Sequence, residues 1–132
     1  MEGYIIPIEQ ETKDNANFRH ILYTTHHSQL VLMSLKPGED IGAETHGGDQ
    51  FFRFEAGEGE VMMDGKKHAV KGGDAVLIPA GTEHNITNTS TDEPLKLYTV
   101  YSPPQHEDGL VNKTKASAEK NDKPFEGKTS ED

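Results

Sequence analysis

The sequence predicts an all-β domain, and two observations carry this prediction. The 132-residue chain contains 13 glycines and 7 prolines, and only 32% of its residues are hydrophobic. This composition suits many short strands joined by tight turns better than a bundle of helices. In addition, short runs rich in β-branched and aromatic residues recur at regular intervals, as expected for a sandwich or barrel. A chain of this length forms one domain with a modest core.

Three regions are expected along the chain. Residues 1–19 form an N-terminal arm, because residues 9–17 are polar and show no periodic pattern. Residues 20–102 form the β-barrel, and residues 103–132 form a C-terminal tail. The tail has few hydrophobic residues and interspersed charges of both signs, so it cannot build a core of its own. We therefore expect it to be mostly disordered, apart from a short helix at residues 114–120.

Eight short strands are predicted between the arm and the tail. Each is rich in aliphatic, β-branched or aromatic residues and is bounded by turn residues. Asp64-Gly65 separates the fourth strand from the fifth and predicts a two-residue hairpin, because a type I′ turn needs positive φ at both central positions. The predicted strands are residues 20–24, 29–35, 50–55, 59–63, 67–70, 74–78, 84–88 and 95–101.

Charge and residue usage exclude several classes of function. The net charge is −10, with 23 acidic and 13 basic residues, so nucleic acid and anionic membranes are poor candidate partners. Cysteine is absent, which excludes disulfides, thiolate ligands and a cysteine nucleophile. Residues 1–7 lack a basic leader and a long apolar stretch, so neither a signal peptide nor a membrane span is predicted, and we expect a cytoplasmic protein.

Four side chains from two segments form a candidate metal site. Glu44 and His46, at positions i and i+2 of an extended segment, point the same way, and a turn at the following glycines can return Gln50 to that face. His84 follows a Pro/Gly turn that can place it beside the first three. A carboxylate, two imidazoles and an amide oxygen suit a divalent ion such as Fe, Mn, Zn or Ni. The alternatives are a solvated carboxylate for Glu44 and a hydrogen-bonding role for Gln50.

The two segments resemble the two motifs of the cupin superfamily. This resemblance implies a double-stranded β-helix, which is the jelly-roll or cupin barrel, with one bound metal ion. The second motif, G-x5-P-x-G-x2-H-x3-N, is matched at every fixed position by Gly73, Pro79, Gly81, His84 and Asn88. The first, G-x5-H-x-H-x3,4-E-x6-G, is matched by Gly38, His46 and Gly57, with Glu44 in place of the first His and Gln50 in place of the Glu.

Further residues are candidates for the wall of the pocket. Tyr98 and Tyr101 lie on opposite faces of the last predicted strand, so one of them can face the metal and act as a catalytic acid or base. Counting from Gln50 places Phe52 on the same side, as pocket wall or plain core. His106 is expected in a solvated loop, and the alternative is a position over the mouth of the pocket.

The expected function is a metal-dependent enzyme that acts on a small oxygen-containing molecule. Two imidazoles and a carboxylate resemble the ligand set of non-haem iron oxygenases, while Mn, Zn or Ni would support isomerase or lyase chemistry. Arg53 is expected to point outward and Arg19 to lie near the arm, so a neutral or carboxylated substrate is favoured over a phosphorylated one. The alternative is a non-catalytic ligand-binding or sensor protein. We also expect a homodimer, because an open sandwich leaves an unpaired edge.

Overall fold

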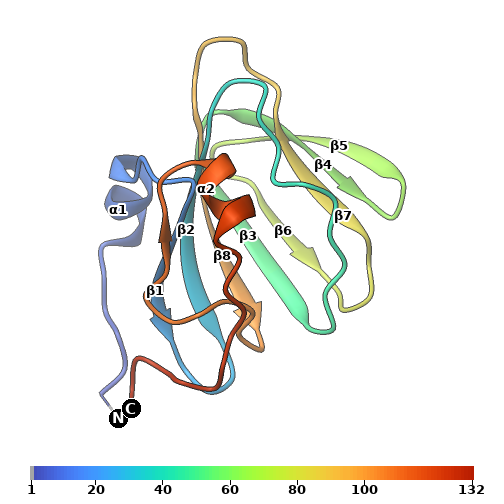
Figure 1. The fold of residues 1–132 in the computed structure, drawn as a ribbon. Coiled ribbons are helices and arrows are strands. Elements are labelled where there is room, and N and C mark those ends of the chain that lie inside the picture. The colour runs from blue at the N-terminus through green and yellow to red at the C-terminus, as the bar shows by residue number, and fades with distance from the viewer. Residues whose placement is uncertain (1) are drawn as a thin grey trace.

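Residues 2–132 are described by a computed structural model, and most of them lie in or between β-strands (Figure 1). Each of the eight predicted strands lies within one residue of an observed strand at both ends. Both helices are too short and too polar to cross a bilayer, so the described chain offers no candidate membrane-spanning helix. In chain order the elements are α1 (Ile8–Asp14), β1 (Arg19–Thr24), β2 (Gln29–Leu35), β3 (Asp49–Ala56), β4 (Glu58–Met63), β5 (Lys66–Lys71), β6 (Ala75–Ile78), β7 (His84–Asn88), β8 (Leu95–Ser102), β9 (Val111–Asn112) and α2 (Lys115–Lys120).

The strands form two antiparallel sheets that enclose the core. The larger sheet has the order β6-β3-β8-β2-β1-β9, and the smaller has the order β5-β4-β7. Figure 1 shows the smaller sheet, in green and yellow, beside the larger one. This arrangement confirms the predicted all-β class and the double-stranded β-helix.

The core lies between the inner faces of the two sheets. Residues alternate between buried and less buried along β8 and along β3 up to its last residue, as expected when one face of a strand packs on a core. On β3 the inner face carries Gln50, Phe52 and Phe54, in agreement with the predicted parity. The buried hydrophobic cluster that these strands share also includes Met33, Val61, Ile78, Ile86, Leu95, Leu97 and Tyr101.

The predicted hairpin between β4 and β5 is confirmed. Met63 pairs with Lys66, so only Asp64 and Gly65 remain in the turn. Both have positive φ, at 52° and 79°, as the type I′ turn requires. Asp64 is the one residue other than glycine with positive φ in the described chain, which matches the tolerance of aspartate for this conformation.

The N-terminal arm contains a helix that the sequence pattern does not reveal. Helix α1 has one buried residue, Thr12, and therefore no hydrophobic face to detect. Contacts between residues four apart stabilise it instead, namely the Lys13–Glu9 ion pair at 3.0 Å and the Gln10–Asp14 hydrogen bond at 2.9 Å. Such contacts between neighbouring turns leave no periodic pattern of hydrophobic residues, so the sequence pattern does not reveal this helix.

The expectation of a mostly disordered C-terminal tail is wrong, because the tail folds along β1. Strand β9 pairs with the edge of β1, where Asn112 lies opposite Arg19. Near the end of the chain, the Ser130 N–H donates to the Thr24 carbonyl at 2.9 Å. The predicted short helix is present as α2, capped by Thr114. Backbone pairing with an open edge orders these residues, together with the burial of Ala118 in the hydrophobic cluster.

Candidate metal centre

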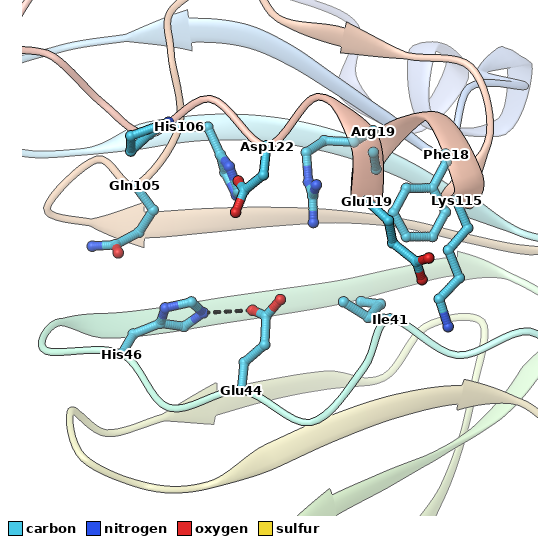
Figure 2. A pocket seen from close by; sticks show the side chains of 12 residues that line it. Phe18, Arg19, Ile41, Glu44, His46, Gln105, His106, Lys115, Glu119 and Asp122 are labelled. Atoms are coloured by element: carbon cyan, nitrogen blue, oxygen red, sulfur yellow. Dashed lines mark ion pairs between the residues drawn. The ribbon is translucent and has the colours of Figure 1, made fainter.

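A pocket of about 380 Å³ opens between the segment 41–46, which precedes β3, and the C-terminal tail. Figure 2 shows its two walls: Arg19 of β1, helix α2 and the tail on one side, and Ile41, Glu44 and His46 on the other. The pocket therefore has one wall built from the first cupin-like segment and one wall built from residues near the two ends of the described chain.

The predicted ligands Glu44, His46 and His84 cluster beside this pocket, which Glu44 and His46 line. Each offers one ligand atom, and these atoms lie within 4.8 Å of one another. Glu44 and His84 exchange two backbone hydrogen bonds, at 2.9 and 3.0 Å, which hold the two segments side by side. Glu44 thus forms an isolated bridge with His84 of β7 and lies outside the regular strands. The carboxylate Oε2 lies 2.8 Å from Nε2 of His46.

The fourth predicted ligand, Gln50, lies in the same cluster. Its side chain is buried, and its Oε1 lies 3.0 Å from Nε2 of His84. The amide nitrogen donates to the Thr99 hydroxyl at 3.0 Å, which fixes the oxygen toward the histidine. The structure therefore brings all four predicted ligands together.

The hydrogen bonds around His84 fit a cation better than an empty cluster. Nδ1 of His84 lies 2.9 Å from the Thr82 carbonyl, which can only accept, so Nδ1 carries the proton. In a neutral ring Nε2 then has a lone pair, and it faces the Gln50 oxygen, which is also an acceptor in this amide orientation. Two acceptors at 3.0 Å repel each other unless a proton or a metal ion lies between them.

His46 supplies a second observation of the same kind. Its Nε2 is buried and has no partner with hydrogen-bond alignment, although Glu44 Oε2 lies at contact distance. A buried nitrogen without a hydrogen bond is costly unless another group binds it. The donor set of two imidazoles, one carboxylate and one amide oxygen therefore fits a divalent metal ion.

Electrostatics keep Glu44 ionised. Burial raises the pKa of Glu44, but the contact with His46 and the positive charge of Arg19 outweigh burial and hold this pKa below its ordinary value. At neutral pH Glu44 is therefore a carboxylate anion, which is the form that binds a metal.

Of the two candidate tyrosines, Tyr101 faces the pocket side. It is 2% exposed, and its ring lies edge-on to that of His46 at 5.5 Å. Tyr98 lies on the opposite face of β8, where its ring packs 6.3 Å from that of Phe51. The Tyr101 hydroxyl lies 3.3 Å from Nε2 of His106.

His106 and Tyr101 form a neutral buried pair. Burial raises the pKa of Tyr101 to about 12. Burial, together with the nearby charge of Arg19, lowers the pKa of His106 to about 3. At neutral pH the phenol therefore keeps its proton and His106 is an uncharged imidazole. His106 is not in a solvated loop, because two backbone hydrogen bonds with the Gln29 amide hold it over the pocket, at 2.8 and 3.1 Å.

Arg19 is the pocket residue that the sequence analysis misplaced. It was expected near the arm, but it is 6% exposed and lines the pocket. Its guanidinium carbon lies 5.4 Å from the centre of the Phe18 ring. Arg19 and the buried Ile21 are two residues apart on β1, so strand parity is the signal that places both on the inner face.

Comparison with known proteins agrees with this geometry. The family model described as Cupin domain matches residues 31–101. The uncharacterized protein YrkC of Bacillus subtilis is 46% identical over 87% of this chain and 65% of its own length. The uncharacterized protein L612 of Acanthamoeba polyphaga mimivirus is 44% identical over 83% of this chain and 71% of its own length. The chain thus spans about two-thirds of the curated relatives it matches.

Solved structures show the same fold. A protein from Bacillus halodurans is 46% identical, covers 91% of this chain and 96% of its own, and superposes with a TM-score of 0.87. A protein described as a predicted oxalate decarboxylase from Thermotoga maritima is 29% identical, covers 57% of this chain and 65% of its own, and has a TM-score of 0.54.

Proposed function

The chain belongs to the cupin family, and from this membership and its clustered ligand atoms we propose that it is a metal-dependent enzyme for a small oxygen-containing organic molecule. One observation carries the proposal: Glu44, His46, Gln50 and His84 bring their ligand atoms together beside a pocket, where Nε2 of His84 faces another acceptor and Nε2 of His46 has no hydrogen-bond partner. An open pocket of about 380 Å³ beside them leaves room for a small substrate.

The four side chains would hold one divalent ion, which is Fe, Mn, Zn or Ni by ligand type. Such an ion supplies Lewis acidity for isomerase or lyase chemistry, or redox chemistry with dioxygen if it is iron. The Thr82 carbonyl orients the ring of His84, and the Thr99 hydroxyl orients the Gln50 amide. These second contacts fix the ligand atoms before any ion binds.

Tyr101 is the proposed catalytic residue, because it holds a proton next to the ligand cluster. With its pKa raised to about 12 by burial, the phenol is a hydrogen-bond donor at neutral pH. It can donate to an oxygen atom of a substrate, and His106, 3.3 Å away, is the neutral group that can accept from it when no substrate is bound. Tyr98 lies on the outer face of β8 and has no part in this proposal.

Elemental analysis of protein purified without chelators tests the metal site. We expect one divalent ion per chain in the wild type, and loss of most of it in Glu44→Ala and His84→Ala variants that keep the wild-type circular dichroism spectrum. His68→Ala is the matched control, because His68 lies exposed on β5, outside the cluster. A wild-type protein that takes up no divalent ion, even after dialysis against each of the four metals, would contradict the proposal.

A non-catalytic ligand-binding cupin is the second candidate, and the burial of Tyr101 favours it. This side chain is 2% exposed and is not among the residues that line the pocket. Oxygen uptake by iron-loaded protein and turnover of small hydroxy acids and keto acids separate the two. The enzyme predicts activity that Tyr101→Phe abolishes while metal content is unchanged, and the binding protein predicts ligand affinity without turnover.

A further inference from the structure

Arg19 carries a buried charge that no other residue neutralises by contact. Arg19 lies on β1 and is only 6% exposed to solvent. No carboxylate in residues 2–132 forms an ion pair with it. Its Nε is buried without a hydrogen-bond partner. Desolvating a charge without a partner is strongly unfavourable, so such a residue is rare unless a ligand supplies the partner.

The guanidinium is held in the pocket and directed across it. Figure 2 shows Arg19 extending from the wall of β1 toward Glu44 on the opposite wall. The ring of Phe18, itself buried, supports it from one side. Support by an aromatic ring fixes the planar group, and a hydrogen bond with the neutral Tyr101 phenol leaves its charge unbalanced.

The carboxylates nearest to the pocket do not serve as its partner. Glu44 contacts His46 instead and acts on Arg19 only through its field. Glu119 and Asp122 line the outer part of the pocket but are exposed to solvent and make no ion pair with Arg19. Lys115, the other basic residue of the pocket, is already paired with Asp40. Of the lysine and arginine residues that line the pocket, Arg19 is thus the one that makes no ion pair within residues 2–132.

We propose that Arg19 binds the carboxylate group of the substrate, which is then a small organic acid. This rests on the proposed function, since it places the substrate in the same pocket. The planar fork of a guanidinium matches the two oxygens of a carboxylate. A single guanidinium balances one negative charge, whereas a phosphate dianion would meet the repulsion of Glu44, Glu119 and Asp122. The other end of the acid then lies toward Glu44 and His46.

Paired ligands that differ only in charge test this inference. Lactate, glycolate and pyruvate are titrated by calorimetry against their amides and inorganic phosphate, in chelator-treated and in Zn²⁺-loaded protein. We expect at least one acid to bind the wild type roughly tenfold to a hundredfold more tightly than Arg19→Gln, which corresponds to the loss of one charge-assisted pair. The corresponding amide should bind both proteins equally.

Arg53→Gln is the matched control, because Arg53 is the second of the chain's two arginines. Its side chain is 41% exposed and pairs with Glu55 at 2.8 Å, so its removal should leave carboxylate binding unchanged. Arg19→Lys, which keeps the charge but not the fork, should bind with intermediate affinity. Thermal melting distinguishes ligand binding from a structural role. If Arg19 binds ligand, the melting temperature of Arg19→Gln equals or exceeds that of the wild type, because the substitution removes an unpaired buried charge. A structural role predicts a lower melting temperature.

The outcomes separate this inference from the metal site. If none of the acids binds, if the affinity of Arg19→Gln stays within twofold of the wild type in both forms, or if phosphate shows the Arg19 dependence and the acids do not, the inference is wrong. A wild type without metal would contradict the proposed function alone, because the chelator-treated arm still measures Arg19. An unchanged metal content in Arg19→Gln shows that the two sites are independent.

Discussion

Asn88, the last fixed position of the second motif, is predicted to stabilise the fold rather than to bind the metal. It is 1% exposed at the end of β7, away from the ligand cluster. Its amide nitrogen donates to the Leu35 carbonyl at 3.0 Å and to the Glu93 carbonyl at 2.8 Å. Its amide oxygen accepts from the Ser90 N–H at 2.9 Å. One side chain therefore joins the end of β2 to the loop before β8.

The Asn88→Ala substitution removes all three hydrogen bonds. The Leu35 carbonyl is buried and loses about 1–3 kcal/mol when left unsatisfied, while the two partly solvated groups lose about 0.5–1 kcal/mol each. The sum is a loss of about 2–5 kcal/mol in the free energy of unfolding, which is a large part of the roughly 5–15 kcal/mol that stabilises a typical domain. Asn88→Asp should be similarly destabilised, because a carboxylate would face two carbonyls.

Urea denaturation followed by circular dichroism measures this loss, and the slope with urea should stay at its wild-type value. A decrease of less than about 1 kcal/mol would refute the hydrogen-bond accounting. Loss of bound metal from a variant that remains folded would refute the structural role and place Asn88 in the metal site.

Three further predictions concern the site and its surroundings. Gln50→Glu should raise the affinity for divalent ions by about tenfold or more, because a carboxylate replaces a neutral amide, and chelator competition that shows no change would remove Gln50 from the ligand set. Hydrogen bonds from Lys115, the larger effect, and from Asn85 hold the pKa of the Asp40 carboxyl below its ordinary value. The stability that this carboxylate contributes is therefore fully present above its pKa in the unfolded chain, and it is lost as the pH falls through the lower pKa of the folded protein. The difference in unfolding free energy between wild type and Asp40→Asn, about 0.5 kcal/mol at neutral pH for a partly exposed pair, should therefore shrink at acid pH in urea titrations. Leu77 is 65% exposed on edge strand β6, and Leu77→Lys should convert the proposed homodimer to a monomer in light scattering, whereas a wild type that is already a monomer would contradict the dimer.

The metal half of the site follows from local patterns in the sequence. His84 comes two residues after a Pro/Gly turn, and the spacing of Glu44 and His46 places both on one side of an extended segment. Gln50 needs only the short turn that precedes β3. Each of these relations spans a few residues, so turn chemistry and strand parity are sufficient to predict it.

Most of the other wall of the pocket depends on contacts between distant residues, which a local pattern does not reveal. His106 lies over the pocket because the buried Gln29 amide, 77 residues away, bonds to its backbone N–H and carbonyl. Strand parity puts Arg19 on the same face as Ile21, but the pocket on that face is closed by residues of the tail, which are distant in the sequence. The composition of the tail predicted disorder because the tail has few hydrophobic residues. Composition carries no information about the unpaired backbone N–H and C=O groups on the edge of β1, to which the tail binds.

The metal ligands and the proposed anion site are held by different parts of the chain, so substrate preference can change without loss of the metal site. The ligand cluster is held by backbone bonds between Glu44 and His84 and by Thr82 and Thr99, none of which involves the tail. The proposed anion site is held by β1 and lies under α2. Substitutions on α2 and the tail can therefore alter the shape and charge of the pocket while the metal ligands stay in place. A Glu119→Lys variant, at the exposed rim of the pocket, should bind small organic acids more tightly and keep its metal content, because one repulsive charge becomes attractive. A parallel loss of metal would show that the two walls are coupled.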